Sequence, residues 1–289
     1  MSGCSSLGSA ILSNLSNKFI HNNYFLVKYF HTAGQVVDFA HYKSDVIKII
    51  NQWVGLNTNG MIDSLVTDSD VKESTKLVLA NALSFDGKWA SRFESQKSIL
   101  FKKDNGESLT LPGMAQACHH HYYHSDELKY STIQLDYADK YSMIVILPDE
   151  TDGLSSLMTQ FSAGEFKNML AKAENKAVDV TIPKFKMNYD MSDAADRLSR
   201  MGLSNIFSEN ANFSLLASES LHIERILHKA VIDVDQEGTR AAAATGLVAA
   251  SDTGQLDTEI NFIADHPFAF ALIHNTTKTI LFYGQYYGK

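Results

Sequence analysis

Asp233-Val-Asp-Gln-Glu-Gly-Thr-Arg-Ala-Ala-Ala-Ala-Thr-Gly-Leu-Val-Ala-Ala-Ser-Asp252 is the stretch that decides how the rest of the chain is interpreted. It follows on from an alternating apolar and polar pattern, Ala230–Asp235, that is typical of a strand. Gly238 then introduces a run of small residues that neither caps a helix nor anchors a core. Taken alone, the four alanines Ala241–Ala244 favour a short exposed helix or a linker.

The same run has a different meaning if it is extended, because alternate side chains then point to opposite faces. One face would carry Thr239, Ala241, Ala243, Thr245, Leu247, Ala249 and Ser251. The only charge before Asp252 belongs to Arg240, on the other face. Such a strand could enter the middle of a sheet without burying a charge or a bulky group on its core side.

Five short stretches, in the same order along the chain, resemble the serpin family. Asn81–Trp89 (Asn-Ala-Leu-Ser-Phe-Asp-Gly-Lys-Trp) is similar to the third strand of that family's main sheet. His228–Ala230 and Gln236–Thr239 are similar to its fifth strand and to the hinge of its reactive-centre loop. Phe262–Phe268 and Ile280–Gly284 resemble its closing strands, especially in the ovalbumin-like branch. The resemblance implies an α+β fold with a mixed main sheet, smaller sheets and surrounding helices.

The resemblance also predicts the organisation of the chain. No internal repeat or low-complexity linker divides the 289 residues, so residues 1–289 are expected to form one serpin domain, with residues 236–258 as the reactive-centre loop. Ala10–Leu15 looks like the second strand of the main sheet. Nothing before it could supply the family's first three helices, so we expect a domain that is incomplete at its N-terminus.

Composition limits the classes of partner and the cellular compartments that we expect for this chain. A formal net charge of -8 argues against nucleic acid or an anionic membrane as a general partner, and we expect a monomer. Two cysteines, Cys4 and Cys118, and the lack of a signal peptide favour the cytoplasm. The extracellular space is favoured by glycan acceptor tripeptides at Asn14, Asn212 and Asn275. It is also the usual location that the resemblance to the family implies. The localisation therefore stays open.

Local patterns predict several further elements. Asn23–Phe30 is aromatic-rich and indicates a short helix, and Ser44 is placed to cap a second helix that ends near Asn59–Gly60. Residues 155–174 indicate one or two helices, and residues 192–201 another. Val178–Lys186 reads as a strand that turns at its proline and changes sheet.

One polar residue, Asn81, interrupts a long apolar strand over residues 76–85 and needs a buried partner. The resemblance supplies His228 on the strand across the gap where the loop inserts. In the family such a pair belongs to the shutter, and Trp89 belongs to the neighbouring breach. We therefore expect Asn81, His228 and Trp89 to have structural rather than catalytic roles.

The densest chemical cluster is Cys118-His-His-His-Tyr-Tyr-His124. In a strand His119 and His121 share a face, yet no carboxylate or second histidine pair stands at ligand spacing, so we expect no functional metal site and no cofactor. Catalytic motifs such as a G-x-S-x-G elbow, a phosphate-binding loop or H-E-x-x-H are also missing. An enzyme is the weakest interpretation.

The resemblance implies a suicide inhibitor of serine, and possibly cysteine, endopeptidases. The protease attacks the loop and forms a covalent acyl-enzyme, and the loop then inserts between strands 75–85 and 226–235. In this mechanism a hinge must enter the sheet first and stay small. Its residues are Gln236, Glu237, Gly238, Thr239, Ala241, Ala242, Ala243 and Ala244.

Counting along the loop as the family does places the scissile bond at Asp252–Thr253, with Ser251–Asp252 and Ala250–Ser251 still open. An acidic residue there would suit a protease with a basic pocket, such as a caspase or a granzyme-B-like enzyme, whereas cleavage after Ala250 would suit an elastase-like one. The alternative is a non-inhibitory or inactive carrier or interaction protein of the same fold, because the N-terminal helices are missing.

Overall fold

The computed structural model of the chain describes residues 4–14, 32–214, 220–239 and 260–288. Two compact units share the chain. Unit 1 comprises residues 1–3, 86–185 and 233–289, and unit 2 comprises residues 4–85 and 186–232. Each is described by itself, and the single domain over residues 1–289 stays a prediction. No helix among the described residues is long and apolar enough to cross a membrane.

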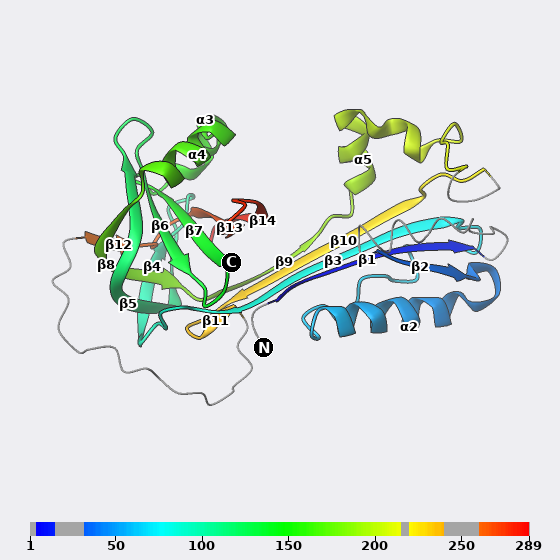
Figure 1. Cartoon of the computed structure of the whole chain (residues 1–289), viewed down its shortest axis with the longest axis horizontal. Coiled ribbons are helices and arrows are strands. Elements are labelled where there is room, and N and C mark those ends of the chain that lie inside the picture. The colour runs from blue at the N-terminus through cyan, green and yellow to red at the C-terminus, as the bar shows by residue number, and fades with distance from the viewer. Residues whose placement is uncertain (1–3, 15–31, 215–219, 240–259, 289) are drawn as a thin grey trace. The chain divides into compact units, whose positions relative to one another are not determined.

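A six-stranded sheet has the order β2-β1-β3-β11-β10-β9. Its strands are β1 (Cys4–Asn14), β2 (Thr32–Val37), β3 (Leu77–Lys88), β9 (Phe185–Asp190), β10 (Arg225–Val234) and β11 (Gly238–Thr239). β3 and β10 pair in parallel from Val78–Arg225 to Ser84–Val231 (Figure 1). This confirms that the two segments expected to flank the inserting loop belong to one sheet. β1 begins at Cys4 rather than at Ala10.

Helix α2 (Phe39–Asn57) belongs to unit 2 and starts earlier than its sequence suggests. Oδ1 of Asp38 accepts hydrogen bonds from the N–H groups of Ala40 and His41, both at 3.0 Å, which satisfies the first turn. The predicted cap at Ser44 is therefore wrong. A break in helical geometry at Tyr42 separates the true start from the regular apolar pattern that the prediction followed.

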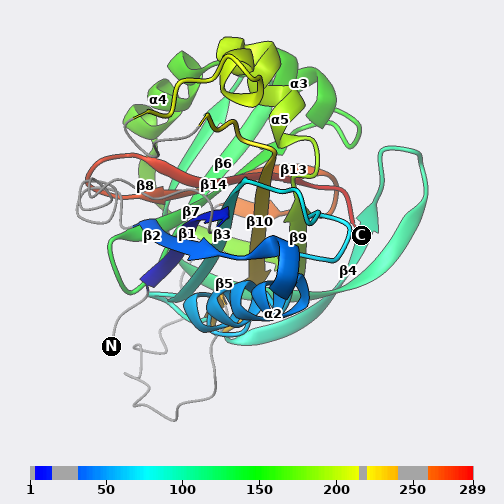
Figure 2. The same cartoon turned by 90° about the vertical axis from the view of Figure 1, so that its right-hand side faces the viewer.

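One face of the six-stranded sheet packs against α2 in unit 2, as Figure 2 shows for the helix and the strands. Val46, Ile50 and Val54 of the helix are almost fully buried. The sheet contributes small and medium apolar residues to the same core, and these are Val78, Ala80, Ala82, Leu227 and Val231. The even-numbered residues of β3 thus face the helix.

Unit 1 contains an eight-stranded sheet in which β12-β8-β5-β6-β7-β13-β14 is the strand order and β4 pairs with β5. The strands are β4 (Ser95–Lys102), β5 (Ser108–Ser125), β6 (Tyr130–Asp136), β7 (Tyr141–Pro148), β8 (Glu174–Pro183), β12 (Ile260–Ile263), β13 (Phe268–His274) and β14 (Ile280–Tyr286). Helices α3 (Leu154–Gln160) and α4 (Ala163–Lys172) pack on one face through a core that includes Tyr130, Ile144 and Met169. The prediction of one or two helices within residues 155–174 is confirmed, and the structure has two.

The chain changes sheet at a proline. β8 ends at Pro183 in the eight-stranded sheet and β9 begins at Phe185 in the six-stranded one, which confirms the predicted switch. The helix predicted over residues 192–201 is shorter than expected. Regular α5 covers Ala194–Leu198 and passes into a π-helical turn over Ser199–Leu203 and a 3-10 turn over Ser204–Phe207. The helix predicted at Asn23–Phe30 lies outside the described residues.

Candidate functional site

A tight turn in unit 1 reverses the chain between β10 and β11. Oδ1 of Asp235 accepts the N–H groups of Glu237 (2.8 Å) and Gly238 (3.1 Å), and the N–H of Asp235 donates to the carbonyl of Gly238 at 2.9 Å. Burial, together with the nearby Asp233, raises the pKa of the Asp235 carboxyl, and the hydrogen bond from Gly238 opposes this. The turn directs the predicted hinge back toward β3.

The first two residues after the turn already form part of the sheet. Gly238 and Thr239 of β11 pair antiparallel with Lys88 and Gly87 of β3, and Thr239 also pairs with Val234 of β10. A Cβ atom on Gly238 would lie 2.1 Å from the carbonyl oxygen of Gly87. Only glycine permits this close approach of two strands.

Thr239 is fully buried, and its hydroxyl lies 2.8 Å from that of Tyr137. The Tyr137 ring stacks on Trp89 with centroids 4.3 Å apart. Burial raises the pKa of the Tyr137 phenol, so the hydroxyl keeps its proton at neutral pH. Nε1–H of Trp89 in turn donates to the carbonyl of Asp235 at 2.8 Å. The inner side of the hinge is therefore held by two aromatic residues.

Polar contacts hold the outer side of the same turn. Gln96 Nε2 and Lys184 Nζ donate to Oε1 of Gln236 at 2.9 and 3.0 Å. Arg92 forms an ion pair with Glu237. These contacts hold Gln236 and Glu237, the two hinge residues that precede β11.

In unit 2, Asn81 and His228 are direct partners in the register of β3 and β10. Both are partly buried, and burial lowers the pKa of His228 although the nearby Asp190 opposes the shift. The structure thus brings together two of the three residues that the sequence grouped as shutter and breach. Trp89 instead lies at the hinge in unit 1.

The family model described as "Serpin (serine protease inhibitor)" matches residues 12–288 of this chain. The chain belongs to the serpin family. The family confirms the predicted α+β serpin fold and the predicted class of function, a protease inhibitor rather than an enzyme.

Named relatives and solved structures agree with this family. The serpin is 34% identical over 267 residues to a serine protease inhibitor of Cyanea capillata, covering 90% of this chain and 70% of the relative. It is 35% identical over 259 residues to the leukocyte elastase inhibitor of Bos taurus, with 86% and 68% covered. Uncleaved ovalbumin superimposes with a TM-score of 0.87 at 26% identity over 100% of this chain and 75% of that one. A thyroxine-binding globulin complex with thyroxine gives 0.85 at 25% identity, with 99% and 76% covered.

Sequence reasoning about this serpin missed the side chains that hold the hinge, which are Tyr137, Arg92, Gln96 and Lys184. Tyr137 follows β6 and Arg92 follows Trp89, and neither carries a local pattern that indicates a contact with the loop. The remaining predicted loop residues, which are Ala241, Ala242, Ala243, Ala244, Asp252 and Thr253, lie outside the described residues.

The histidine cluster does not converge on one point. His119 and His121 are exposed, whereas His120 is buried on the other face of β5. Within the part of the chain that the structure describes, no group of three histidine, cysteine, aspartate or glutamate residues is arranged to hold a metal ion. Nothing in the described geometry therefore turns this cluster into a metal centre.

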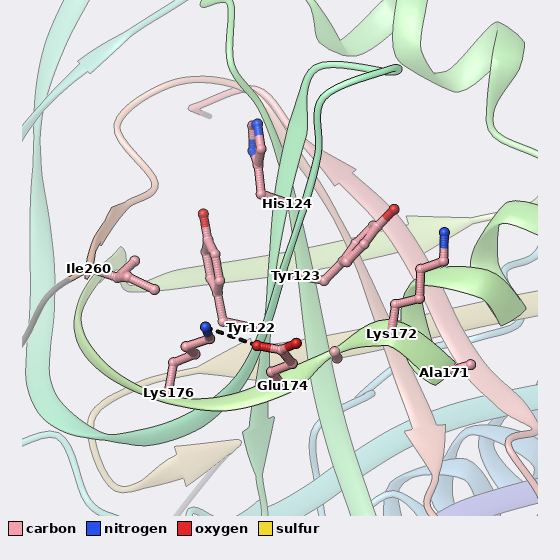
Figure 3. Close-up of a pocket in the computed structure, with 9 residues that line it drawn as sticks. Tyr122, Tyr123, His124, Ala171, Lys172, Glu174, Lys176 and Ile260 are labelled. Carbon is pink, nitrogen blue, oxygen red and sulfur yellow. Dashed lines mark ion pairs between the residues drawn. The ribbon is translucent and has the colours of Figure 1, made fainter.

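A polar pocket of about 590 Å³ lies where α4 ends and β8 begins (Figure 3). The side chains of Tyr122, Tyr123, His124 and Lys172 line it, and Lys176 is engaged by Glu174 at 2.9 Å.

Proposed function

We propose that this serpin inhibits a serine-type endopeptidase by offering residues 236–258 as a substrate and then inserting the cleaved loop between β3 and β10. Attack by the protease gives an acyl-enzyme, and insertion carries the attached protease away before the ester is hydrolysed. The stretch Gly238–Asp252 is fifteen residues long, so full insertion would move its end by about 50 Å. Pairing of the new strand on both sides would drive the step.

The observation that carries this proposal is the register of β11. Six steps along the loop from the Thr239–Gly87 pair lead to Thr245 opposite Asn81. Six steps from the Thr239–Val234 pair lead to Thr245 opposite His228. Asn81 and His228 are themselves partners in the register of β3 and β10. The pairing with β3 and the pairing with β10 therefore predict the same position for Thr245. One strand would therefore fit both neighbours without a bulge.

The same register supplies a reason for the small residues on both faces of the loop. Ala244 and Gly246 would arrive beside Ala82 and Ala80, which pack under α2. The helix adds a second steric limit, because a larger side chain at Ala244 would meet the α2 core.

The partner that we propose is a serine or cysteine protease bound as a covalent complex by a monomeric inhibitor. Asp252 is proposed as the specificity residue, which favours a basic pocket such as that of a caspase or a granzyme-B-like enzyme. Mass spectrometry of the protease-nicked serpin tests this directly. A cut after Ala250 would favour an elastase-like target instead, and any cut other than after Asp252 removes the caspase hypothesis.

Incubation with a panel of serine and cysteine proteases tests inhibition. We expect a complex that survives boiling in SDS, and a large gain in thermal stability after the loop is nicked. The variant Thr239→Arg should lose the complex, since Thr239 is fully buried and a charge there would have no partner. Ordinary cleavage by every protease, with no stable band and no gain in stability, would contradict the proposal.

A second candidate function, that of a carrier, rests on a different pocket in unit 1. This pocket of about 540 Å³ lies beside α4, where Phe166, Leu170 and Ile280 give it apolar walls. The ammonium groups of Lys167 and Lys278 also line it and have no hydrogen-bond or ion-pair partner among the described residues. An apolar cavity with cations at its edge suits an amphipathic acid.

Titration calorimetry with thyroxine, the ligand named in one structural neighbour, tests the carrier function. We expect binding that weakens in Lys278→Gln and is unchanged in Lys186→Gln, a lysine outside the pocket. No binding heat, or equal binding by both variants, would remove the carrier hypothesis without affecting the inhibitor.

A further inference from the structure

The polar pocket of about 590 Å³ in unit 1 forms where β5 loses a neighbouring strand. β5 pairs with β8 from Gly113–Pro183 as far as Tyr122–Glu174. The chain before Glu174 belongs to helix α4, so no described strand continues this pairing past Tyr122. Tyr123 points away from Tyr122, because successive side chains of a strand alternate. The pocket therefore wraps around an open strand edge and has a tyrosine on each side of it.

The two ends of this pocket differ in chemistry (Figure 3). Ile260 and the ring of Tyr122 lie on one side of β5, and Lys172 extends on the other side, beyond Tyr123. The first end can hold a flat ring against an aromatic side chain, and the second end carries a cation. A ligand that fills both ends must therefore join an aromatic ring to an anion.

Lys172 is the cation that is available to such a ligand. Its ammonium group has no hydrogen-bond or ion-pair partner among the described residues, and the hydroxyl of Tyr123 has no hydrogen-bond partner among them either. The lining contains two lysines and one glutamate, so it is net positive on a protein whose formal net charge is -8. An anionic group is therefore favoured in this pocket.

Glu174 lies between the two ends of the pocket (Figure 3). Lys176 contacts its carboxylate at 2.9 Å, and the hydrogen bond and charge of Lys176 lower the pKa of Glu174. The carboxylate therefore stays ionised at neutral pH and can only accept hydrogen bonds. The part of the ligand that joins the ring to the anion must then offer a donor, and a hydroxyl group is suited to this.

We propose that the pocket binds a nucleoside monophosphate, with the base against Tyr122 and Ile260, a sugar hydroxyl at Glu174 and the phosphate at Lys172. The ammonium group of Lys172 and the hydroxyl of Tyr123 donate to the phosphate oxygens. The volume of about 590 Å³ is within the range of small-molecule sites. The site uses neither the reactive-centre loop nor the apolar pocket beside Phe166, so it stands or falls independently of inhibition and of the carrier hypothesis.

Ligand-observed NMR titrations of the full chain with adenosine monophosphate, adenosine and inorganic phosphate test whether the ends act together. We expect the nucleotide to bind about tenfold more tightly than either fragment, since charge-assisted hydrogen bonds and stacking each contribute at least this much. A nucleotide that binds no better than adenosine would overturn the phosphate end and the proposal. A nucleotide that binds no better than phosphate, or not at all, would overturn it as well.

A pair of lysine variants tests the cation. Lys172→Gln removes a charge from an exposed side chain and should weaken nucleotide binding about tenfold while adenosine binding is unchanged. Lys167→Gln is the matched control, because it removes the same charge from the same helix but from the lining of the apolar pocket. The control should bind the nucleotide as the wild type does. An equal loss in both variants, or no loss in Lys172→Gln, would overturn the site.

A pair of tyrosine variants tests the aromatic end. Tyr122→Leu should weaken nucleotide binding about fivefold or more, because the ring against which the base packs is lost. Tyr122→Phe keeps the ring and loses only the hydroxyl that contacts Ser131, so its binding should match the wild type. Equal binding by the leucine and phenylalanine variants would overturn the placement of the base. If Tyr122→Leu does not fold, the two lysine variants decide the proposal by themselves.

Discussion

The hydroxyl of Tyr137 lies 2.8 Å from the hydroxyl of Thr239, in a contact between two positions 102 residues apart. Both side chains are buried, at 3% and 0% exposure. The contact joins the eight-stranded sheet of unit 1 to the first loop residues that have entered the other sheet. It therefore ties the eight-stranded sheet to the position from which the proposed insertion would continue.

Tyr137→Phe should loosen the hinge without disturbing its packing, because only the hydroxyl is removed and the ring can still stack on Trp89. Loss of a buried hydrogen bond costs about 1 kcal/mol, or a few degrees in Tm. The sharper measurement is the rate of amide hydrogen exchange at Thr239, which leaves its hydroxyl in place. We expect faster exchange in Tyr137→Phe than in the wild type.

Tyr189→Phe is the control for that experiment, since Tyr189 is 44% exposed and lies outside the hinge. Equal exchange rates in the wild type and both variants would show that the hydroxyl pair does not hold Thr239 in place.

Gly238→Ala should block the hinge, because its Cβ would overlap the backbone of Gly87. We expect β11 to leave the slot, the complex with protease to be lost, and the nicked protein to gain little stability. Gly164→Ala in α4 is the matched control: its Cβ would meet only Ser162 Oγ, at 3.4 Å, and alanine favours the helix. Inhibition by Gly238→Ala equal to that of the control would mean that insertion does not use the observed pairing.

The two strands between which the loop would insert, β3 and β10, could be predicted from the sequence because their apolar patterns and the family resemblance identify them. Pro183 likewise marks the change of sheet. The partners of the hinge could not be predicted in this way. Tyr137 is one of twelve tyrosines, and nothing near it in the sequence indicates a contact so far along the chain. Trp89 is assigned to the breach by the resemblance alone, and nothing in the sequence indicates that its indole donates to the carbonyl of Asp235. Such contacts depend on tertiary packing, which periodicity does not encode.

His120 should make the stability of unit 1 sensitive to acid. Burial lowers its pKa from the ordinary value of 6.5, although a hydrogen bond with the backbone of Gln134 and the charge of Asp136 oppose the shift. Its Nε2 has no hydrogen-bond partner among the described residues. A lowered pKa means that the folded state binds this proton less well than the unfolded chain does. The contribution of His120 to the free energy of unfolding is therefore fully present above pH 6.5 and is lost as the pH falls below it. His120→Leu should flatten the fall of Tm between pH 7 and pH 5.

His119→Leu, an exposed neighbour on the same strand, is the control and should keep the wild-type slope. If both variants follow the wild-type curve, the buried imidazole is not the source of the acid sensitivity.

The register of insertion can be tested with a disulfide. Four steps from the Thr239–Gly87 pair bring Ala243 opposite Leu83, and directly opposed residues have Cβ atoms about 4.5–5.5 Å apart, close enough for a bridge with a small adjustment. In a Cys4→Ser, Cys118→Ser background, Leu83→Cys with Ala243→Cys should oxidise readily after the loop is nicked and poorly before. Leu83→Cys with Ala242→Cys places the second thiol on the opposite face and should not link in either state. A bridge in that control, or none in the first pair, would mean that the loop enters in another register, and the alignment of Thr245 with Asn81 and His228 would then fail with it.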